Sequence, residues 1–312
     1  MSEISIITGN ANLTLAKEIC DQLKLNLTEA LVSRFSEGEI RVKVEGNVRG
    51  KDVFIVQPTC RPVNENFMEL LILIDAVKRA SARRVTAVIP YYGYARQDRK
   101  DQPRVPITAK LVANLITAAG ANRVLTMDLH ASQIQGFFDI PVDHLYAINT
   151  ICEYFSDKKI KDLVVVSPDA GGIRMARAYA KKLSAGLAIV DKRRDSPDKT
   201  EVMHILGDVK GKHAVLVDDI IATGSSLMEA TEELKKRGAH DVYAAVSHGV
   251  LSGNALQKIQ DSKSLKEVVI TNSIPLPDPE KNTKIKVLSI ASLLAEAIKR
   301  IHEEKSISCL FF

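Results

Sequence analysis

The segment Val215-Leu216-Val217-Asp218-Asp219-Ile220-Ile221-Ala222-Thr223-Gly224-Ser225-Ser226 has the pattern of a buried strand followed by a polar turn. The apolar run His213–Val217 predicts a parallel strand that stops at two carboxylates, and the apolar spacing of Leu227–Arg237 predicts a helix. The turn between them presents backbone N–H groups and hydroxyls to an anion. We expect a phosphate ester at this turn, and sugar hydroxyls or hydrated Mg²⁺ at the acids. The alternative is an ordinary turn with a serine cap.

The rest of the chain alternates short apolar runs with helical patterns. Alternation of this kind predicts the α/β class with mainly parallel sheets. The helical patterns are Asn12–Leu23, Asn64–Ala80, Ile107–Ala119, Gly171–Leu183 and Ser225–Arg237. The predicted strands are Ile4–Ile7, Asp52–Gln57, Val85–Ile89, Arg123–Met127, Leu163–Val166, Leu187–Val190, His213–Val217 and Asp241–Val246.

The chain also repeats itself. Val48-Arg49-Gly50-Lys51 before one predicted strand matches Val209-Lys210-Gly211-Lys212 before another, and Met68-Glu69 matches Met228-Glu229, both pairs roughly 160 residues apart. Coincidence is the alternative, because strand–helix spacing is similar in many α/β proteins. The repeat predicts two similar domains related by internal duplication, residues 1–147 and 148–312. The C-terminal helix, residues 290–303, is expected to pack back on the first domain.

Composition narrows the class of protein. The 312 residues are 46% apolar and 26% charged, which is typical of a soluble globular protein. A net charge of +5 suits small polyanionic substrates but is too diffuse to indicate nucleic acid. The four cysteines show no metal-ligand spacing, so we expect reduced thiols. With no signal-peptide pattern and no apolar run of about 20 residues, we expect a cytoplasmic protein without a membrane span.

Two loops in the first half carry further candidate residues. The segment Arg83–Lys100 runs from a strand into a Pro/Gly/Tyr loop, where Arg96 could bind a triphosphate and Gln97 an adenine edge. The segment Asp128–Phe138 places Asp128 and His130 after a strand, where an imidazole can ligate a metal or hold a phosphate. A solvated loop and a structural histidine are the alternatives.

Two loops in the second half also carry candidate residues for binding phosphate or a metal. In Ser167–Gly172, two glycines allow backbone N–H groups to approach a diphosphate, and Asp169 can hold Mg²⁺. A Pro-Asp helix cap is the alternative. In Asp191–Lys199, Lys192 and Arg194 share a face if the segment is extended, and could close on phosphate charge. The alternative is an exposed charged hairpin.

Together these segments resemble the ribose-phosphate pyrophosphokinases (phosphoribosyl diphosphate synthetases), most closely the phosphate-activated class. The resemblance rests on Arg34–Glu39, the Tyr94–Asp98 run, the long Asp128–Phe138 run and the spacing of the substrate loops. It implies two phosphoribosyltransferase-type domains, the first for ATP and oligomer contacts and the second for ribose 5-phosphate. It implies transfer of the diphosphoryl group of Mg-ATP to the anomeric hydroxyl, a cytoplasmic role in nucleotide biosynthesis and a homohexamer. Ala222 departs from the usual third acid of the loop.

The resemblance also implies residue roles. Lys192 and Arg194 are the expected catalytic pair, and Phe35, Glu37, Glu39, Arg96 and Gln97 the expected ATP-binding residues, with the first three reaching in from a neighbouring subunit. His130 and Asp169 are expected to hold Mg²⁺, and Ala170, Gly171 and Gly172 to form the diphosphate loop. Ribose 5-phosphate is expected on Asp218, Asp219, Thr223, Gly224, Ser225 and Ser226. A regulatory anion site is expected from Arg49, Ser81, Arg104, Ser132, Gln135, Ser306 and Ser308.

Two rival interpretations share part of this pattern. A phosphoribosyltransferase could carry the same Asp218–Gly224 loop, but would need neither the duplicated domain nor the Asp128–Phe138 run. A non-catalytic regulatory partner would keep the fold and would be expected to lose basic catalytic residues or gain insertions. Lys192, Arg194, His130 and Asp169 are all present, so the sequence favours the enzyme.

Overall fold

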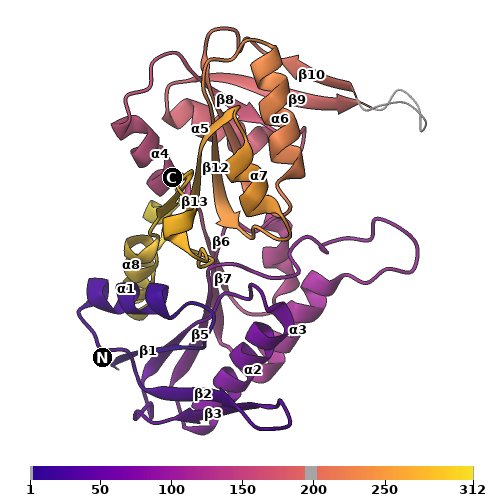
Figure 1. Cartoon of the computed structure of the whole chain (residues 1–312). Coiled ribbons are helices and arrows are strands. Elements are labelled where there is room, and N and C mark those ends of the chain that lie inside the picture. Colours follow the sequence, from indigo (N-terminus) through magenta and orange to yellow (C-terminus); the bar gives the residue numbers. More distant parts are fainter. Residues whose placement is uncertain (1–2, 194–201, 312) are drawn as a thin grey trace. The chain divides into compact units, whose positions relative to one another are not determined.

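The computed structural model describes residues 3–193 and 202–311 and divides into two compact units (Figure 1). Unit 1 comprises Met1–Tyr146, Ser273–Pro275 and Ser289–Phe312, and unit 2 comprises Ala147–Asn272 and Leu276–Leu288. The C-terminal residues therefore belong to the unit that begins the chain. No helix in the described ranges combines the length and hydropathy that a membrane span requires.

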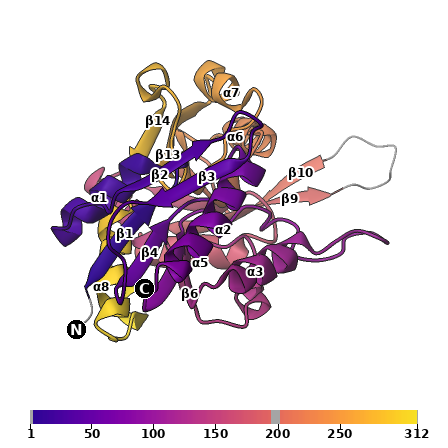
Figure 2. The same ribbon diagram turned by 90° about the horizontal axis from the view of Figure 1, so that it is seen from below.

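Unit 1 is built on a five-stranded sheet in which every neighbouring pair is parallel. Its order is β1 (Ile4–Thr8), β4 (Asp52–Val56), β5 (Arg84–Ile89), β6 (Arg123–Met127) and β7 (Val142–Leu145). Helices α2 (Val63–Arg79) and α3 (Thr108–Ala119) lie on one side, and α1 (Leu13–Leu23) and α8 (Ala291–His302) on the other (Figure 1). Strands β2 (Ala30–Arg34) and β3 (Ile40–Val44) form a separate antiparallel hairpin (Figure 2).

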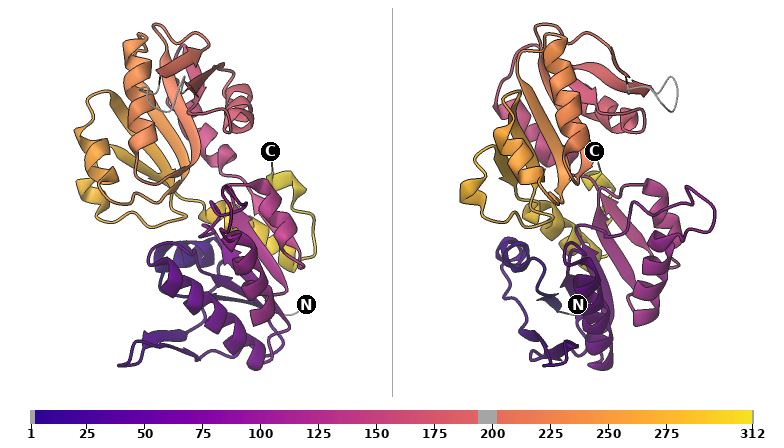
Figure 3. Two further views of the ribbon diagram at one scale, coloured as in Figure 1. Left: turned by 90° about the vertical axis from the view of Figure 1, so that its right-hand side faces the viewer. Right: turned by 45° about the vertical axis from the view of Figure 1, so that its right-hand side comes forward.

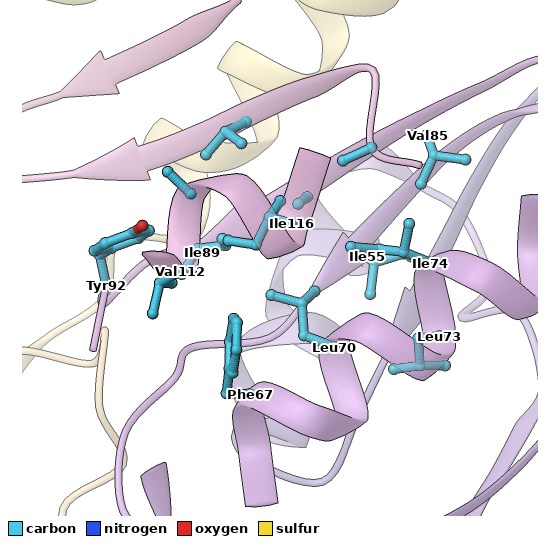
Figure 4. Close-up of a cluster of buried hydrophobic side chains, with 14 of the residues drawn as sticks. Ile55, Phe67, Leu70, Leu73, Ile74, Val85, Ile89, Tyr92, Val112 and Ile116 are labelled. Carbon is cyan, nitrogen blue, oxygen red and sulfur yellow. The ribbon is translucent and has the colours of Figure 1, made fainter. Parts of the chain in front are cut away.

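The core of unit 1 explains why α2 and α3 lie where they do. Phe67, Leu70, Leu73, Ile74 and Val77 recur at three- and four-residue spacing, so α2 presents one apolar stripe to the sheet. Figure 4 shows this stripe packed with side chains from α3 and from the strands. The larger side chains of this cluster are fully buried or nearly so, and burial of each such side chain stabilises the fold by about 1.5–3 kcal/mol.

The C-terminal segment is fastened to unit 1 by a charged cluster. Asp52, which is only 1% exposed, pairs with Arg84 and lies 3.0 Å from Nδ1 of His302. A guanidinium N–H of Arg84 also donates to the carbonyl of Ile301 at 3.0 Å. These bonds join β4 and β5 to the end of α8. Helix α8 packs against α1, and together the two helices form the layer on that side of the sheet.

Unit 2 has a seven-stranded sheet covered on both faces. Its order is β10 (Val202–Leu206), β9 (Gly186–Arg193), β8 (Leu163–Ser167), β11 (His213–Ile221), β12 (Val242–Gly249), β13 (Leu265–Thr271) and β14 (Ile285–Leu288). Only β10 runs antiparallel to its neighbour among these described strands. Helices α6 (Ser225–Lys236) and α7 (Ala255–Asp261) pack on one face (Figure 3), and α4 (Ile148–Asp157) and α5 (Ile173–Lys182) supply the other layer.

The two sheets repeat one topology, as the sequence repeat predicts. In each unit the first strand lies beside the strand that follows an antiparallel hairpin, and the remaining strands then add in chain order. The difference is the hairpin itself, because β9–β10 extends the sheet of unit 2 whereas β2–β3 forms a sheet of its own.

The direction in which successive strands are added to the sheet of unit 2 reverses between β8 and β11. Successive strands are added on opposite sides of this pair, and ligands of open α/β sheets bind at the carboxyl ends of strands at such a point.

The predicted strands and helices all occur, but several elements lay outside the prediction. No sequence pattern had predicted β2, β3, β7, β10, β13, β14, α4 or α7. The prediction was also wrong about the end of β11. This strand continues through both acids to Ile221, because its pairing with β12 runs to Gly249 while its pairing with β8 ends at Leu216.

Candidate active site

The acids of unit 2 lie where β11 passes the last paired residue of β8. Asp219 is buried, Asp218 is half-buried, and the backbone N–H of Asp219 donates to Oδ1 of Asp218 at 2.9 Å. Desolvation, then the adjacent Asp219 charge and to a smaller extent Asp169, raise the pKa of Asp218 from 3.8 to about 8. Three carboxylates that influence one another in this way can coordinate a cation or accept hydrogen bonds from hydroxyls.

The turn after these acids forms the N-terminus of α6. Gly224 precedes the helix with φ of +72°, a conformation that residues with a side chain rarely adopt. Oγ1 of Thr223 lies 3.5 Å from Oγ of Ser225. The first N–H groups of a helix have no partner within it, so the turn offers donors to an anion.

A lysine that the sequence analysis missed lies against this turn. Nζ of Lys258, on α7, donates to Oγ of Ser225 at 2.8 Å and to the carbonyl of Thr223 at 3.3 Å. The lysine places a positive charge beside this turn from a different helix. Nothing in the sequence of α7 indicates this role, because the contact depends on the packing of α6 against α7.

The Ser167–Gly172 segment connects β8 to α5 and is the second loop at this edge. Oδ1 of Asp169 accepts the backbone N–H of Gly172 at 2.9 Å, and Oγ of Ser167 donates to the carbonyl of Asp169 at 2.7 Å. A Cβ at Gly172 would lie 2.7 Å from Oγ of Ser167, so the close turn requires glycine there. The bond from Gly172 to Asp169 closes the turn before α5, whose N-cap residue is Gly172, so Asp169 is not the helix cap that the alternative supposed. Asp169 is exposed at the loop surface.

One member of the predicted catalytic pair, Lys192, lies near the end of β9. Lys192 belongs to this strand, paired with Met203 of β10. Arg194 lies outside the described residues.

Two of the five nucleotide candidates, Arg96 and Gln97, line a cavity of about 370 Å³ in unit 1. Arg96 and Gln97 from the loop after β5 face it together with His130 from the loop after β6. Oε1 of Gln97 accepts from Oγ1 of Thr108 at 2.5 Å, which fixes the amide at the start of α3. The structure therefore brings together two segments that the sequence analysis treated separately.

The His130 loop is held by hydrogen bonds that backbone N–H groups donate. Strand β6 ends at Met127, and Asp128 has φ of +39°, so strand alternation does not continue to His130. The N–H of Asp128 donates to the carbonyl of Leu145, and that of Leu129 donates to Nε2 of His144, both at 2.9 Å. Asp128 is buried and His130 is exposed, so His130 is the residue available to a ligand.

The hairpin candidates lie at the tip of β2–β3. Phe35 is 46% exposed, and Glu37 and Glu39 are exposed as well. The tip is ordered by a backbone bond of 2.9 Å from the N–H of Phe35 to the carbonyl of Glu39. The guanidinium of Arg41 lies 5.6 Å from the centre of the Phe35 ring. An exposed aromatic ring on an ordered tip is available to stack on a ligand or partner.

The predicted regulatory residues form local groups within unit 1. The loop of Arg49 is tied to Ser81, whose carbonyl accepts the N–H of Gly50 at 2.8 Å. Ser306 and Ser308 line a second pocket of about 500 Å³ and are 3.1 Å apart through their hydroxyls. Arg104 lies in an exposed loop, and Ser132 and Gln135 belong to the short helix η1 (Ser132–Phe137). The regulatory site stays a prediction.

Comparison with known proteins identifies the family. Residues 4–120 match the N-terminal domain of ribose phosphate pyrophosphokinase, and residues 194–312 match the phosphoribosyl synthetase-associated domain. Over 311 residues the chain is 58% identical to a ribose-phosphate pyrophosphokinase of Caldanaerobacter subterraneus, covering 99% of this chain and 98% of the relative. The chain belongs to the ribose-phosphate pyrophosphokinase family.

Two further relatives agree with this assignment. The ribose-phosphate pyrophosphokinase of Bacillus caldolyticus is 55% identical, over 99% of this chain and 98% of that protein. The crystal structure of phosphoribosylpyrophosphate synthetase from Mycobacterium smegmatis superimposes with a TM-score of 0.91 at 41% identity. It covers 97% of this chain and 100% of its own, so family members share both units.

Proposed function

We propose that this chain transfers the diphosphoryl group of ATP to the anomeric hydroxyl of ribose 5-phosphate, giving phosphoribosyl diphosphate and AMP. The main support for this function is the sequence identity of 52–58% between this chain and full-length ribose-phosphate pyrophosphokinases. The enzyme thereby feeds nucleotide biosynthesis. The phosphoribosyltransferase interpretation loses support, since the similarity extends over both units rather than one loop. The regulatory-partner interpretation loses support because the similar full-length relatives are named as enzymes.

Ribose 5-phosphate binds to unit 2 in this proposal. Asp218 and Asp219 accept hydrogen bonds from the ribose hydroxyls, and the turn from Thr223 to Ser226 holds the 5-phosphate. Lys258 supports the turn with its ammonium group, which lies 2.8 Å from Oγ of Ser225. Hydrogen bonds to a charged group are roughly twice as strong as neutral ones, so this turn would dominate the affinity for the sugar phosphate.

ATP binds to unit 1, with the cavity of Arg96, Gln97 and His130 as its centre. The guanidinium of Arg96 can hold phosphate oxygens in a bidentate arrangement, and the amide of Gln97 can face the nucleotide. The diphosphate being transferred lies against Ala170, Gly171 and Gly172, where the short side chains leave the backbone accessible.

The cluster of Asp169, Asp218 and Asp219 fits a hard divalent cation. Carboxylate oxygens are the ligands that Mg²⁺ prefers. Burial and the neighbouring charge of Asp219 raise the pKa of Asp218, and a bound cation would offset both effects. We propose that Asp169 in unit 2 and His130 in unit 1 are ligands of Mg²⁺. When bound, Mg²⁺ neutralises phosphate charge and orients the two substrates.

The reaction needs positioning and charge neutralisation more than covalent chemistry. The anomeric oxygen attacks the β-phosphorus, the bond from the β-phosphorus to the bridging oxygen breaks, and its electron pair leaves with AMP. The hydroxyl proton is released. We propose that Lys192 and Arg194 stabilise the charge that develops on the transferred and bridging oxygens.

The exposed hairpin tip supports a shared site in a homohexamer. Phe35, Glu37 and Glu39 would complete the nucleotide pocket of a neighbouring subunit. Complementation tests this arrangement, because Phe35→Ala and Lys192→Ala damage different halves of one site. Mixed assemblies of the two inactive variants should recover part of the activity, whereas no recovery after confirmed subunit exchange would contradict the shared site.

Labelled ATP tests the reaction itself. Label in the α-phosphate should stay with AMP, and labels in the β- and γ-phosphates should move together into the sugar product. Transfer of the γ-label alone would contradict the proposed function.

A further inference from the structure

Two histidines and an aspartate meet at the amino ends of β11 and β12. His213 is the first residue of β11, and His240 and Asp241 directly precede β12. Nδ1 of His213 lies 3.2 Å from Oδ2 of Asp241, and Nδ1 of His240 lies 3.6 Å from the same oxygen. One ligand atom from each residue fits within 4.8 Å of the others. The three side chains therefore converge on one point.

These spacings match those of a tetrahedral metal centre. Bonds of about 2.0–2.1 Å to nitrogen and oxygen place neighbouring tetrahedral ligands about 3.3–3.4 Å apart. The two nitrogen–oxygen distances, 3.2 and 3.6 Å, lie on either side of that value. Two imidazoles and one carboxylate are a donor set for zinc and similar first-row ions rather than for Mg²⁺.

The backbone holds the ligands in place before any ion binds. The N–H of His240 donates to the carbonyl of Lys212 at 2.7 Å, and the N–H of Ala214 donates to the carbonyl of Asp241 at 2.8 Å. These bonds lie on either side of His213, so both ligand-bearing segments are fixed to one another. A site of this kind loses little backbone entropy when it takes up an ion.

One ligand atom also makes no hydrogen bond within the described residues. That atom is the buried Nδ1 of His213, although Oδ2 of Asp241 is near. A buried imidazole nitrogen without a hydrogen bond is unfavourable. We propose that His213, His240 and Asp241 bind a divalent transition ion of the zinc type, separate from the ions of the reaction.

Lys266 competes with the ion for the carboxylate. Its Nζ lies 2.6 Å from Oδ2 of Asp241, and the side chain is 55% exposed. The same ammonium lies 5.5 Å from the centre of the Tyr243 ring, so it keeps a favourable contact when an ion takes the carboxylate. Removal of this lysine should therefore strengthen ion binding. If the three side chains bind no ion, the same change would only remove the ion pair between Lys266 and Asp241.

The site is remote from the proposed chemistry. His213 and Asp218 belong to one strand, and a rise of about 3.3 Å per residue separates them by about 16 Å. The ion would join the start of β11 to the turn after α6. It would stabilise unit 2 without contacting substrate.

Zinc titration of the chelator-treated full chain tests this site, with calorimetry and thermal denaturation as readouts. Wild type should bind one equivalent that His240→Ala loses, and His204→Ala, at an exposed histidine of β10, should retain it. Because the side chain of His240 is 65% exposed, its removal should leave the fold intact. Lys266→Met should bind the same equivalent about tenfold more tightly, since a competing charge is gone.

Cobalt provides a spectroscopic check. Tetrahedral coordination should give visible d–d bands in wild type and in Lys266→Met but not in His240→Ala. Zinc should also raise the denaturation temperature of wild type and not that of His240→Ala. Equal zinc stoichiometry in wild type and His240→Ala, or weaker binding in Lys266→Met, would overturn the proposal.

Discussion

Nζ of Lys258 donates to Oγ of Ser225 at 2.8 Å, which ties α7 to the first residue of α6. The ammonium therefore lies beside the turn proposed for the 5-phosphate without belonging to it. A positive charge at this position favours a bound phosphate and also fixes the serine hydroxyl.

Lys258→Met should raise the KM for ribose 5-phosphate on the order of tenfold, because a hydrogen bond to a charged group contributes about 1.5–3 kcal/mol. The KM for ATP should change little, and Lys258→Arg should recover part of the loss. The effect should shrink at high ionic strength, since Lys258 is exposed. An unchanged KM in steady-state kinetics would show that the lysine supports only the turn.

Asp218 should make stability depend on pH. Its pKa in the folded chain is raised from 3.8 to about 8, so its stabilising contribution is full at low pH and is lost as the pH rises to about 8. Asp218→Asn has no titrating carboxyl at this position, so the variant should not lose stability there as the pH rises. The unfolding midpoint of the variant in denaturant, without divalent ions, should fall less than that of wild type between about pH 4 and pH 8. Parallel curves for both proteins would contradict the raised pKa.

Gly172→Ala should disturb the diphosphate loop. The new Cβ would lie 2.7 Å from Oγ of Ser167, which is buried and donates to the carbonyl of Asp169. Overpacking of this kind costs about 1–3 kcal/mol, so the denaturation temperature should fall. Gly136→Ala is the matched control, because a Cβ there meets nothing within 4 Å.

A double variant tests whether the contact with Oγ of Ser167 is what makes Gly172→Ala destabilising. Ser167→Ala combined with Gly172→Ala should be more stable than the sum of the two single losses, since the clashing hydroxyl is gone. Simple additivity would show that the glycine is required for another reason.

Lys192 and Arg194 should act mainly in the transition state. Alanine at either position should reduce kcat by about 10²–10⁴ with little change in the KM for ATP. Single-turnover measurements with saturating substrates would isolate the transfer step. A variant that raises KM and keeps kcat would assign these residues to binding instead.

Sequence reasoning predicted what depends on local pattern. The strand and acids of β11, the glycines after β8 and the duplication all leave periodic or compositional signals. The predicted end of β11 was wrong, because the pairing with β12 continues past the point where the pairing with β8 stops. Single-sequence periodicity cannot show that a strand has lost one neighbour and kept the other.

The missed features depend on tertiary packing. Lys258 reaches Ser225 across 33 residues of sequence, and its helix carries no signal of that contact. The joint cavity of Arg96, Gln97 and His130 depends on β5 and β6 being neighbours in the sheet. Substrate contacts from separate loops could be proposed from sequence only one loop at a time.

The identity of the released nucleotide tests the central claim most directly. The chain should be incubated with Mg-ATP and ribose 5-phosphate, and the products followed by ³¹P NMR. AMP and a sugar 1-diphosphate should form in equal amounts, and no AMP should form when ribose 5-phosphate is omitted. Release of ADP with a singly phosphorylated new product would mean attack at the γ-phosphorus and would contradict it.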